Sequence, residues 1–436
     1  MSKENTLPKG RVLETEKHEI QNMKYEDYSW DFRDADTKEL THCIHAYPAM
    51  MIPQIARRLL RKYGSSSDLL FDPYCGSGTS LLEANMKNIN AIGTDLNPLA
   101  RLIADTKTTP IDMQALDLYL KDFHDYSFNF QFNIRKTFSI VIPQFDNINF
   151  WFNENAQKKL ALIKEYIDNV KSPKIKNFFL TAFSETVRES SLTKKNEFKL
   201  VRIPEDKREV FNPDSFGIML SKLSRNKQGL SNFIQQKRNG SSSKIYDFNT
   251  VNYMPKNIVP DKSIDIVITS PPYGDSRTTV AYGQYSRLAN QWMGIKNASN
   301  IDKSLMGGVK YHAEFAFDSA YLRKTLEKIN NKDSKRSKEV ESFFIDYKNS
   351  IDNVAKTIKR KGIVCYVVGN RTVKDINIPM DLITQDFFEN NGFGHLETII
   401  RNIPNKRMPS ENSPSNIPGK KSTTMKNEFI VVFEKH

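Results

Sequence analysis

One unit in the first quarter of the chain constrains the fold more than any other feature. It is predicted to consist of a strand, a glycine turn, a helix and a second strand. Residues 69–71 form a short apolar run, Gly76 and Gly78 follow it, a helix is expected from Thr79, and residues 91–93 form the next apolar run. Such a βαβ unit joins two parallel strands through a helix that packs on the sheet. We therefore predict an α/β fold with a doubly wound, mostly parallel sheet.

Further apolar runs extend this sheet, but they stand far along the chain, at residues 265–269, 362–370 and 428–435. The intervening residues are rich in Phe, Asn and Lys, and their apolar positions follow helical spacing. The expected divisions are therefore an N-terminal arm (1–40), a first half of the sheet domain (41–110), a basic, largely helical insert (111–243) and a second half of the sheet domain (244–436).

The turn after the first strand has the chemistry of a nucleoside site. Gly76 and Gly78 let a ligand approach the backbone, and Asp72 can accept hydrogen bonds from an amino group. Leu81 stands where a dinucleotide fingerprint has its third glycine, and no Gly-Lys-Ser/Thr follows, so neither that fingerprint nor a phosphate loop is present. Asp95, at the end of the second strand, is placed to accept both hydroxyls of a ribose.

Asp247 follows a third short strand, in the sequence KIYDFN. A carboxylate at this position can accept a hydrogen bond from the amino group of an adenine. A helix cap or a turn uses aspartate equally often, so both interpretations stay open.

The run DIVITSPPYGD is the most informative part of the chain. A buried strand ends in Ser270, Pro271, Pro272 and Tyr273. The two prolines fix the backbone and lack N–H groups, which leaves the carbonyls of Ser270 and Pro271 to accept from another molecule. An exocyclic amino group needs such acceptors, and the ring of Tyr273 offers a face on which an extrahelical base can stack.

The charge of the chain favours a polyanionic partner. The formal net charge is +13, and residues 151–250 alone hold 19 Lys and Arg against 11 Asp and Glu. Ordinary solvated charges are the alternative for any single residue. The candidate contacts to nucleic acid in this stretch are Arg188, Lys194, Lys195, Lys199 and Arg202.

Other chemistries are disfavoured by the residues present. None of the three cysteines follows a proline, as the nucleophile of carbon-5 cytosine methylation typically does, and no two cysteines have metal-ligand spacing. We therefore expect no metal site and a reducing cytoplasm. No signal peptide or membrane span is expected. A nuclease centre is disfavoured because the acids of the insert, Glu185, Glu189 and Glu197, have the spacing of solvated faces.

The segments DPYCGSG and TSPPY resemble the cofactor and catalytic motifs of amino-group DNA methyltransferases of bacterial restriction-modification systems. The Ser-Pro-Pro-Tyr form is similar to the branch that methylates N4 of cytosine. Adenine enzymes more often have Asp or Asn at the first position, and N6-adenine methylation is the alternative. The motif order resembles that of enzymes whose recognition region lies between the cofactor and catalytic halves.

The resemblance implies a Rossmann-like methyltransferase sheet that binds S-adenosylmethionine and double-stranded DNA, with no membrane partner. A restriction endonuclease of the same specificity is a further partner that it allows. Rival hypotheses are an amino-group methyltransferase of RNA or protein and a non-enzymatic DNA-binding module. The residues carried over are His45, Tyr47, Pro48, Asp72, Gly76, Gly78 and Thr79 for the methionine end of the cofactor, Asp95 for its ribose, Asp247 for its adenine, and Ser270, Pro271, Pro272 and Tyr273 for the flipped base.

Overall fold

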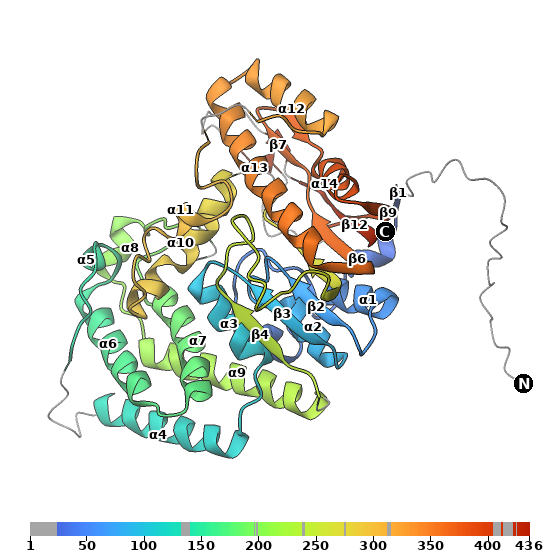
Figure 1. Cartoon of the computed structure of the whole chain (residues 1–436). Helices are drawn as coiled ribbons and strands as arrows, with labels where there is room; N and C mark the ends of the chain where they lie inside the picture. The colour runs from blue at the N-terminus through green and yellow to red at the C-terminus, as the bar shows by residue number, and fades with distance from the viewer. Residues whose placement is uncertain are drawn as a thin grey trace, which may run out of the picture.

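A computed structural model gives the structure of most of the chain (Figure 1). It describes residues 24–131, 140–195, 197, 199–237, 240–273, 276–311, 315–403, 411–412, 422–423 and 425–436. Side chains are not described for residues 276–282, 302, 411–412 and 422–423.

An eight-stranded mixed sheet forms the centre of the molecule, in the order β1-β9-β12-β6-β5-β2-β3-β4. β12 is antiparallel to both of its neighbours, and every other pair in the sheet is parallel. Two short antiparallel ribbons, β7-β8 and β10-β11, accompany it. The strands are β1 (Lys24–Glu26), β2 (Leu69–Asp72), β3 (Asn90–Thr94), β4 (Ser243–Tyr246), β5 (Ile264–Thr269), β6 (Ile358–Val368), β7 (Arg371–Val373), β8 (Ile376–Ile378), β9 (Phe393–Asn402), β10 (Glu411–Asn412), β11 (Ser422–Thr423) and β12 (Asn427–Lys435).

Helices cover the sheet and form most of the regular structure in the described part of the insert (Figure 1). The predicted fold class, a doubly wound α/β sheet with a largely helical insert, is confirmed. The helices are η1 (Tyr28–Trp30), η2 (Leu40–Ile44), α1 (Pro53–Tyr63), α2 (Thr79–Met86), α3 (Pro98–Thr108), α4 (Met113–Gln131), α5 (Ile148–Trp151), α6 (Glu154–Asn169), α7 (Pro173–Glu189), α8 (Glu205–Glu209), α9 (Ser215–Gln236), α10 (Ser276–Trp292), α11 (Ile301–Ser304), α12 (Ala320–Asn330), α13 (Ser334–Thr357) and α14 (Met380–Glu389).

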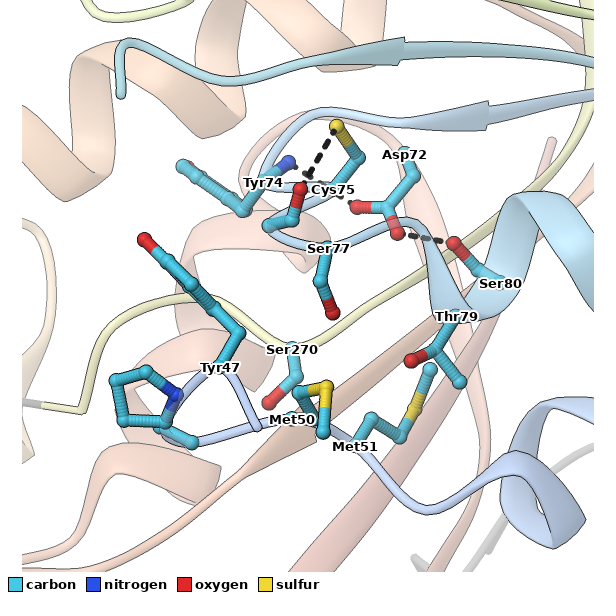
Figure 2. A pocket seen from close by; sticks show the side chains of 13 residues that line it. Tyr47, Met50, Met51, Asp72, Tyr74, Cys75, Ser77, Thr79, Ser80 and Ser270 are labelled. Carbon is cyan, nitrogen blue, oxygen red and sulfur yellow. Dashed lines mark hydrogen bonds between the residues drawn. The ribbon is translucent and has the colours of Figure 1, made fainter. Parts of the chain in front are cut away.

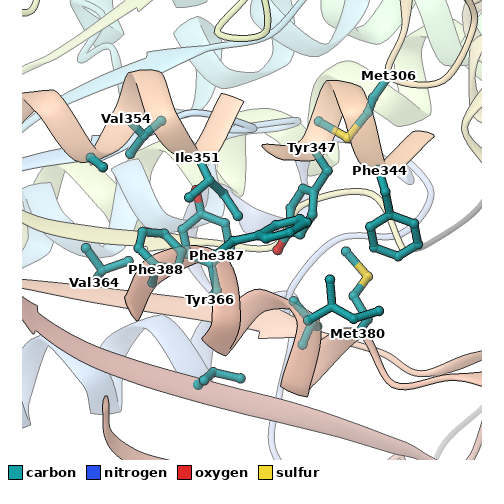
Figure 3. Close-up of a cluster of buried hydrophobic side chains, with 14 of the residues drawn as sticks. Met306, Phe344, Tyr347, Ile351, Val354, Val364, Tyr366, Met380, Phe387 and Phe388 are labelled. Atoms are coloured by element: carbon teal, nitrogen blue, oxygen red, sulfur yellow. The ribbon is translucent and has the colours of Figure 1, made fainter. Parts of the chain in front are cut away.

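The central strands are apolar on both faces because both faces are buried. Successive residues of a strand point to opposite sides, so Val364 and Tyr366 of β6 join the core under α13 and α14, whereas Cys365 and Val367 join the core with α1 and α2. Figure 3 shows the first of these cores, in which the ring centroids of Tyr366 and Phe388 lie 4.9 Å apart. The result is a sheet held between two helical layers.

The chain changes direction across the sheet between β2 and β5. From β2 it proceeds through α2 to β3 on one side, and it later returns to place β5 on the other side of β2. In an open α/β sheet, ligands bind beyond the carboxyl ends of the strands at such a switch point. The glycine turn follows β2 and the Ser-Pro-Pro-Tyr turn follows β5, so the topology brings the two turns together.

Two charged or polar parts of the sequence are ordered in the structure. The N-terminal arm contributes an edge strand, since β1 pairs in parallel with β9, and Trp30 is buried. Residues 320–340, which are rich in Lys and Glu, form α12 and the start of α13, in which Arg336 is buried beside Glu339. Among the described residues, no helix is long and apolar enough to span a bilayer.

Candidate active site

A pocket opens at the switch point, between the glycine turn, the end of β5 and the segment that precedes α1 (Figure 2). The first and last lining residues, Tyr47 and Ser270, are 223 residues apart in the sequence (270 − 47), and only the fold joins them. The lining residues are Tyr47, Pro48, Ala49, Met50, Met51, Asp72, Tyr74, Cys75, Gly76, Ser77, Thr79, Ser80 and Ser270.

The glycine turn has the shape that a bound ligand requires. Gly76 has a φ of +48°, and a Cβ added there would meet no atom within 4 Å, so open space lies beside its backbone. Gly78 has a φ of +79°, and a Cβ there would come within 2.9 Å of the Cβ of Ala104 in α3. Glycine is therefore needed at both positions, at Gly76 for the backbone conformation and at Gly78 also for close packing.

Asp95 supports the turn from the end of β3. Its Oδ2 accepts the N–H of Gly76 at 3.1 Å, and its Oδ1 accepts the N–H of Asn97 at 2.8 Å. Burial raises the pKa of this carboxyl, and the two backbone donors and Arg101 oppose the rise. Each carboxylate oxygen keeps a lone pair for a further donor, because one backbone bond uses only part of its capacity.

Asp72, which lines the pocket, connects the glycine turn to the end of β5. Its carboxylate accepts from Ser80, from the backbone N–H of Tyr74 at 3.1 Å and from the hydroxyl of Thr269 at 2.5 Å. Burial raises the pKa of Asp72 to about 6, and the hydrogen bonds limit the rise. Because Thr269 is the last residue of β5, this contact ties the end of β2 to the residue that precedes the Ser-Pro-Pro-Tyr turn.

A chain of hydrogen bonds holds the Ser-Pro-Pro-Tyr turn. The Tyr273 hydroxyl donates to Oε1 of Glu428 in β12 at 3.1 Å, and Oγ of Ser270 lies 2.9 Å from the same hydroxyl. Since Tyr273 gives its hydrogen to a carboxylate, Ser270 is the donor in the second bond. Arg401 of β9 pairs with the other oxygen of Glu428. The lone pairs of Ser270 are thus left to accept from a substrate.

The remaining residues predicted to hold the cofactor are spread around the pocket. Tyr47 and Pro48 line it, and the Tyr47 hydroxyl accepts from Nδ2 of Asn97 at 3.0 Å. His45 is buried outside the lining, where its Nε2 lies 3.0 Å from Oγ of Ser184. Asp247 also lies outside the lining; it is exposed at the end of β4, with its Oδ2 4.0 Å from Nη2 of Arg101.

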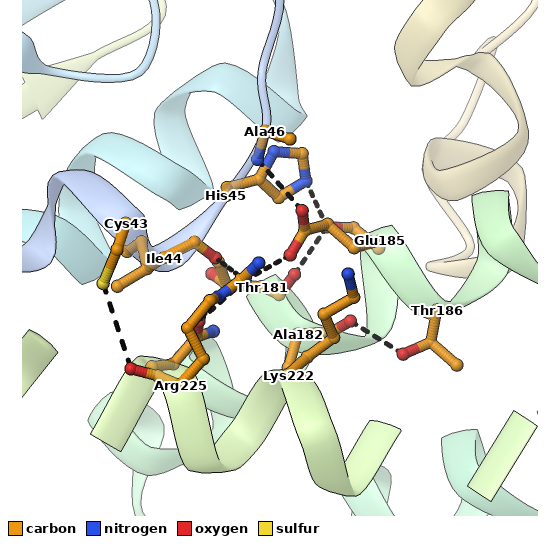
Figure 4. A network of polar contacts seen from close by, with 12 residues as sticks. Cys43, Ile44, His45, Ala46, Thr181, Ala182, Glu185, Thr186, Lys222 and Arg225 are labelled. Carbon is orange, nitrogen blue, oxygen red and sulfur yellow. Dashed lines mark hydrogen bonds and ion pairs between the residues drawn. The ribbon is translucent and has the colours of Figure 1, made fainter. Parts of the chain in front are cut away.

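A polar network connects the insert to the segment that leads into the pocket (Figure 4). Glu185 of α7 accepts the N–H of Ala46 at 3.0 Å and pairs with Arg225 of α9. Arg225 also donates to the carbonyl of Ile44 at 2.7 Å. Arg225 and His45 hold the pKa of the Glu185 carboxyl below its usual value despite burial. The network thus fixes the backbone just before Tyr47.

The predicted DNA contacts fall into two groups. Lys194, Lys195 and Lys199 are exposed on the loop that follows α7, which we call the basic loop (residues 191–203). This loop is pinned by a backbone bond from Lys194 N to Val201 O at 2.7 Å, and Leu200 N donates to Oε1 of Gln284 in α10 at 3.2 Å. It therefore lies beside the helix that follows the Ser-Pro-Pro-Tyr turn.

Arg188 and Arg202 are instead engaged within the protein. The Arg188 guanidinium lies 4.3 Å from the ring centre of Tyr285 and donates to the carbonyls of Tyr285 and Glu197. The Arg202 guanidinium lies 4.2 Å from the ring centre of Phe150. Neither cation is presented as freely as the lysines of the basic loop.

Sequence reasoning missed several residues of this site. Met50 and Met51 were not singled out, although they lie directly after Pro48 in the segment that was noticed. Thr269 stands directly before Ser270, and its position at the strand end was a usable signal. Nothing in the sequence pointed to Glu428, since a charged residue at the start of an apolar strand has no distinguishing pattern.

Relatives of the chain give its family. A family model described as DNA methylase matches residues 2–105, the part that holds the glycine turn. The type II methyltransferase M.MvaI of Kocuria varians is 39% identical over 441 residues, which cover 93% of this chain and 93% of that protein. The chain belongs to the amino-group DNA methyltransferases of restriction-modification type. The predicted family is therefore confirmed for this methyltransferase.

More distant proteins are similar to this methyltransferase in part. The type II methyltransferase M.BsoBI of Geobacillus stearothermophilus is 25% identical over 61% of this chain and 55% of its own length. Among solved structures, the rRNA methyltransferase aviRa of Streptomyces viridochromogenes aligns over 89% of this chain and 88% of its own at 10% identity. Its TM-score is 0.30, so the fold of this methyltransferase is judged from its own sheet topology.

Proposed function

We propose that this DNA methyltransferase transfers a methyl group from S-adenosylmethionine to the exocyclic N4 amino group of a cytosine that is flipped out of double-stranded DNA. The observation that carries the proposal is the Ser270–Tyr273 turn, which ends β5 beside the pocket and has serine at its first position. Ser270 lines that pocket, so an amino group bound at the turn would lie next to a ligand of the glycine turn.

The residues of the pocket fit S-adenosylmethionine, together with Asp95, which lies outside the lining and bonds to the backbone of Gly76. The open space beside Gly76 admits a ligand to the backbone, and Asp95 keeps lone pairs for the two hydroxyls of a ribose. We assign Tyr47, Pro48 and Thr79, together with the turn residues, to the methionine end. When bound, the cofactor supplies an electrophilic methyl group on a sulfonium.

The turn is suited to hold an amino group in line with a methyl donor. Ser270 donates its own hydrogen to Tyr273, so its oxygen accepts one amino hydrogen, and the Pro271 carbonyl is assigned to the other. Positive charge on the nitrogen is then stabilised by these two oxygens, and the extra proton leaves to solvent. Tyr273, whose hydroxyl is anchored on Glu428, offers its ring to the flipped base.

The lysines of the basic loop bind the phosphates of the duplex near the reacting base. Its exposed lysines stand on a segment that contacts α10, and α10 follows the Ser-Pro-Pro-Tyr turn. A base-flipping enzyme must hold the flanking phosphates to keep its register. We further propose that a restriction endonuclease recognises the same DNA sequence. We also propose that the methyltransferase acts in the bacterial cytoplasm, where the DNA lies.

The test is the identity of the methylated base. Purified protein is incubated with plasmid DNA and S-adenosylmethionine, the DNA is digested to nucleosides, and the products are separated by mass spectrometry. N4-methyldeoxycytidine is expected, and Ser270→Ala should reduce its yield. N6-methyldeoxyadenosine in its place would establish the adenine alternative, and methylation of neither base would refute the proposed reaction.

A further inference from the structure

Lys107, at the end of α3, is a buried cation next to the cofactor pocket. Its side chain has no exposed surface. Its Nζ donates to Oγ of Ser77 at 3.2 Å and lies 3.8 Å from Sδ of Met50. Both contacts line the pocket, so the ammonium stands directly behind the pocket wall. Met50 is itself 37% exposed and unbranched, and a small shift of its thioether would bring the ammonium to the pocket surface.

The surroundings of Lys107 lack the anion that a buried ammonium needs. An ammonium has three hydrogens to donate, and a buried charge is costly unless it is paired and hydrogen-bonded. Among the described residues, one hydroxyl and one thioether are its recorded partners, and no carboxylate forms an ion pair with it. The carboxylate of Glu83, which bonds to the neighbouring His42, is also paired with Arg57.

We infer that Lys107 binds the α-carboxylate of the cofactor's methionine part, which completes its coordination from the pocket side. This inference rests on the proposed use of S-adenosylmethionine and names the group that recognises its amino-acid end. Ser77 then holds the ammonium toward the glycine turn, and Met50 closes over the ion pair. Lys107 is a binding residue, since it touches the end of the cofactor that does not react.

The test compares two ligands that differ in the carboxylate. S-adenosylmethionine carries the amino-acid part, whereas 5′-methylthioadenosine has the same nucleoside and thioether but no carboxylate. Lys107→Met keeps the length of the side chain and removes the charge, and Lys87→Met, at an exposed position after α2, is the matched control. Calorimetry should show that Lys107→Met weakens S-adenosylmethionine binding about 10- to 100-fold, the range of a charge-assisted hydrogen bond. Its affinity for 5′-methylthioadenosine should stay within about twofold of that of the wild type.

The thermal stability of the free protein separates a binding role from a structural one. An unpaired buried charge opposes folding, so Lys107→Met should leave the melting temperature unchanged or raise it. A lower melting temperature together with equal losses for both ligands would overturn the inference in favour of a structural role. Equal binding of S-adenosylmethionine to Lys107→Met and wild type would overturn the inference alone. A wild type that does not bind S-adenosylmethionine would overturn the proposed cofactor and the inference with it.

The pH dependence of binding gives a second readout. Burial lowers the pKa of Lys107 to about 7 in the free protein. A bound carboxylate would raise the pKa of Lys107, so binding takes up a proton above pH 7, and affinity falls as the pH increases from there. The titratable groups that interact with Lys107 are Cys43, His42 and His45. Burial lowers the pKa of both imidazoles to about 4 and raises the pKa of the Cys43 thiol, so none of them titrates near pH 7.

Calorimetry of S-adenosylmethionine binding at about pH 7.5, repeated in two buffers of different ionisation enthalpy, measures this proton uptake. Lys107→Met keeps the titration of the cofactor's own amino group and is expected to lose the additional uptake. The same proton uptake in Lys107→Met and wild type would contradict the inference.

Discussion

Tyr273→Phe tests whether the hydrogen-bond chain through Tyr273 prepares Ser270 to accept from the substrate. The change removes one hydroxyl, which lies 2.9 Å from Ser270 and 3.1 Å from Glu428, and keeps the ring. Without it, the Ser270 hydroxyl is no longer held as a donor toward Tyr273 and can turn its hydrogen toward the amino group. One misdirected hydrogen bond is worth about 1–2 kcal/mol, so the rate of methyl transfer should fall about 5- to 30-fold. Glu428 keeps its pairing with Arg401, and the free energy of unfolding should fall by only about 1 kcal/mol.

The measurement is single-turnover methylation of a DNA duplex at saturating enzyme, together with calorimetry of cofactor binding. Tyr273→Phe should slow methyl transfer and leave cofactor affinity unchanged. Tyr273→Ala also removes the stacking face, and it should cost about 1–3 kcal/mol more. A wild-type rate for Tyr273→Phe would refute the proposed role of the hydroxyl. A wild-type rate for Tyr273→Ala would refute base stacking on the ring as well.

Three further predictions concern the cofactor site, the basic loop and the core of the insert. Asp95→Ala should weaken S-adenosylmethionine binding by about 1–3 kcal/mol in calorimetry, and unchanged affinity would remove Asp95 from the site. Replacing Lys194, Lys195 and Lys199 together with Ala should flatten the log–log salt dependence of DNA binding by about two to three units, with cofactor affinity unchanged; an unaltered slope would place the DNA elsewhere. Glu185→Gln should lower the free energy of unfolding by about 3 kcal/mol in urea titrations, because it leaves the partly buried Arg225 without its carboxylate partner, and a loss below about 1 kcal/mol would show that the pair adds little.

The parts of the sheet with a strong local pattern could be predicted from the sequence. One continuous unit contains the strand after residue 68, the helix from Thr79 and the strand around residue 92. Apolar residues and glycines within a few positions indicate each of these elements. β9 was missed because Phe393–Asn402 mixes His, Glu, Thr and Arg with its apolar residues. Its strand character depends on pairing with β12 and β1, which lie at the opposite ends of the chain.

Contacts within the site were harder to predict because they join distant residues. Asp72 and Thr269 are 197 residues apart, and nothing in either sequence context specifies the hydrogen bond between them. Lys107 left a weak signal: it stands four residues after Ile103 and eight after Leu99, so helical spacing places a lysine on the buried face of α3. A single charge on an apolar face is easily taken for the end of a helix, and Lys107 stands one residue before the end of α3. Its burial is a consequence of packing against residues far from it in sequence.

The insert carries the proposed DNA contacts, yet it also supports the cofactor pocket. Glu185 and Arg225 lie on insert helices and bond to the backbone of residues 44 and 46, directly before Tyr47 of the pocket lining. Tyr285 of α10 donates to the carbonyl of Ala46 at 3.0 Å, and its ring meets the Arg188 guanidinium of α7. The basic loop and the segment that borders the pocket therefore both contact α7 and α10. Because α7 and α10 contact both regions, we expect a substitution that unfolds either helix to disturb the pocket lining as well as the basic loop.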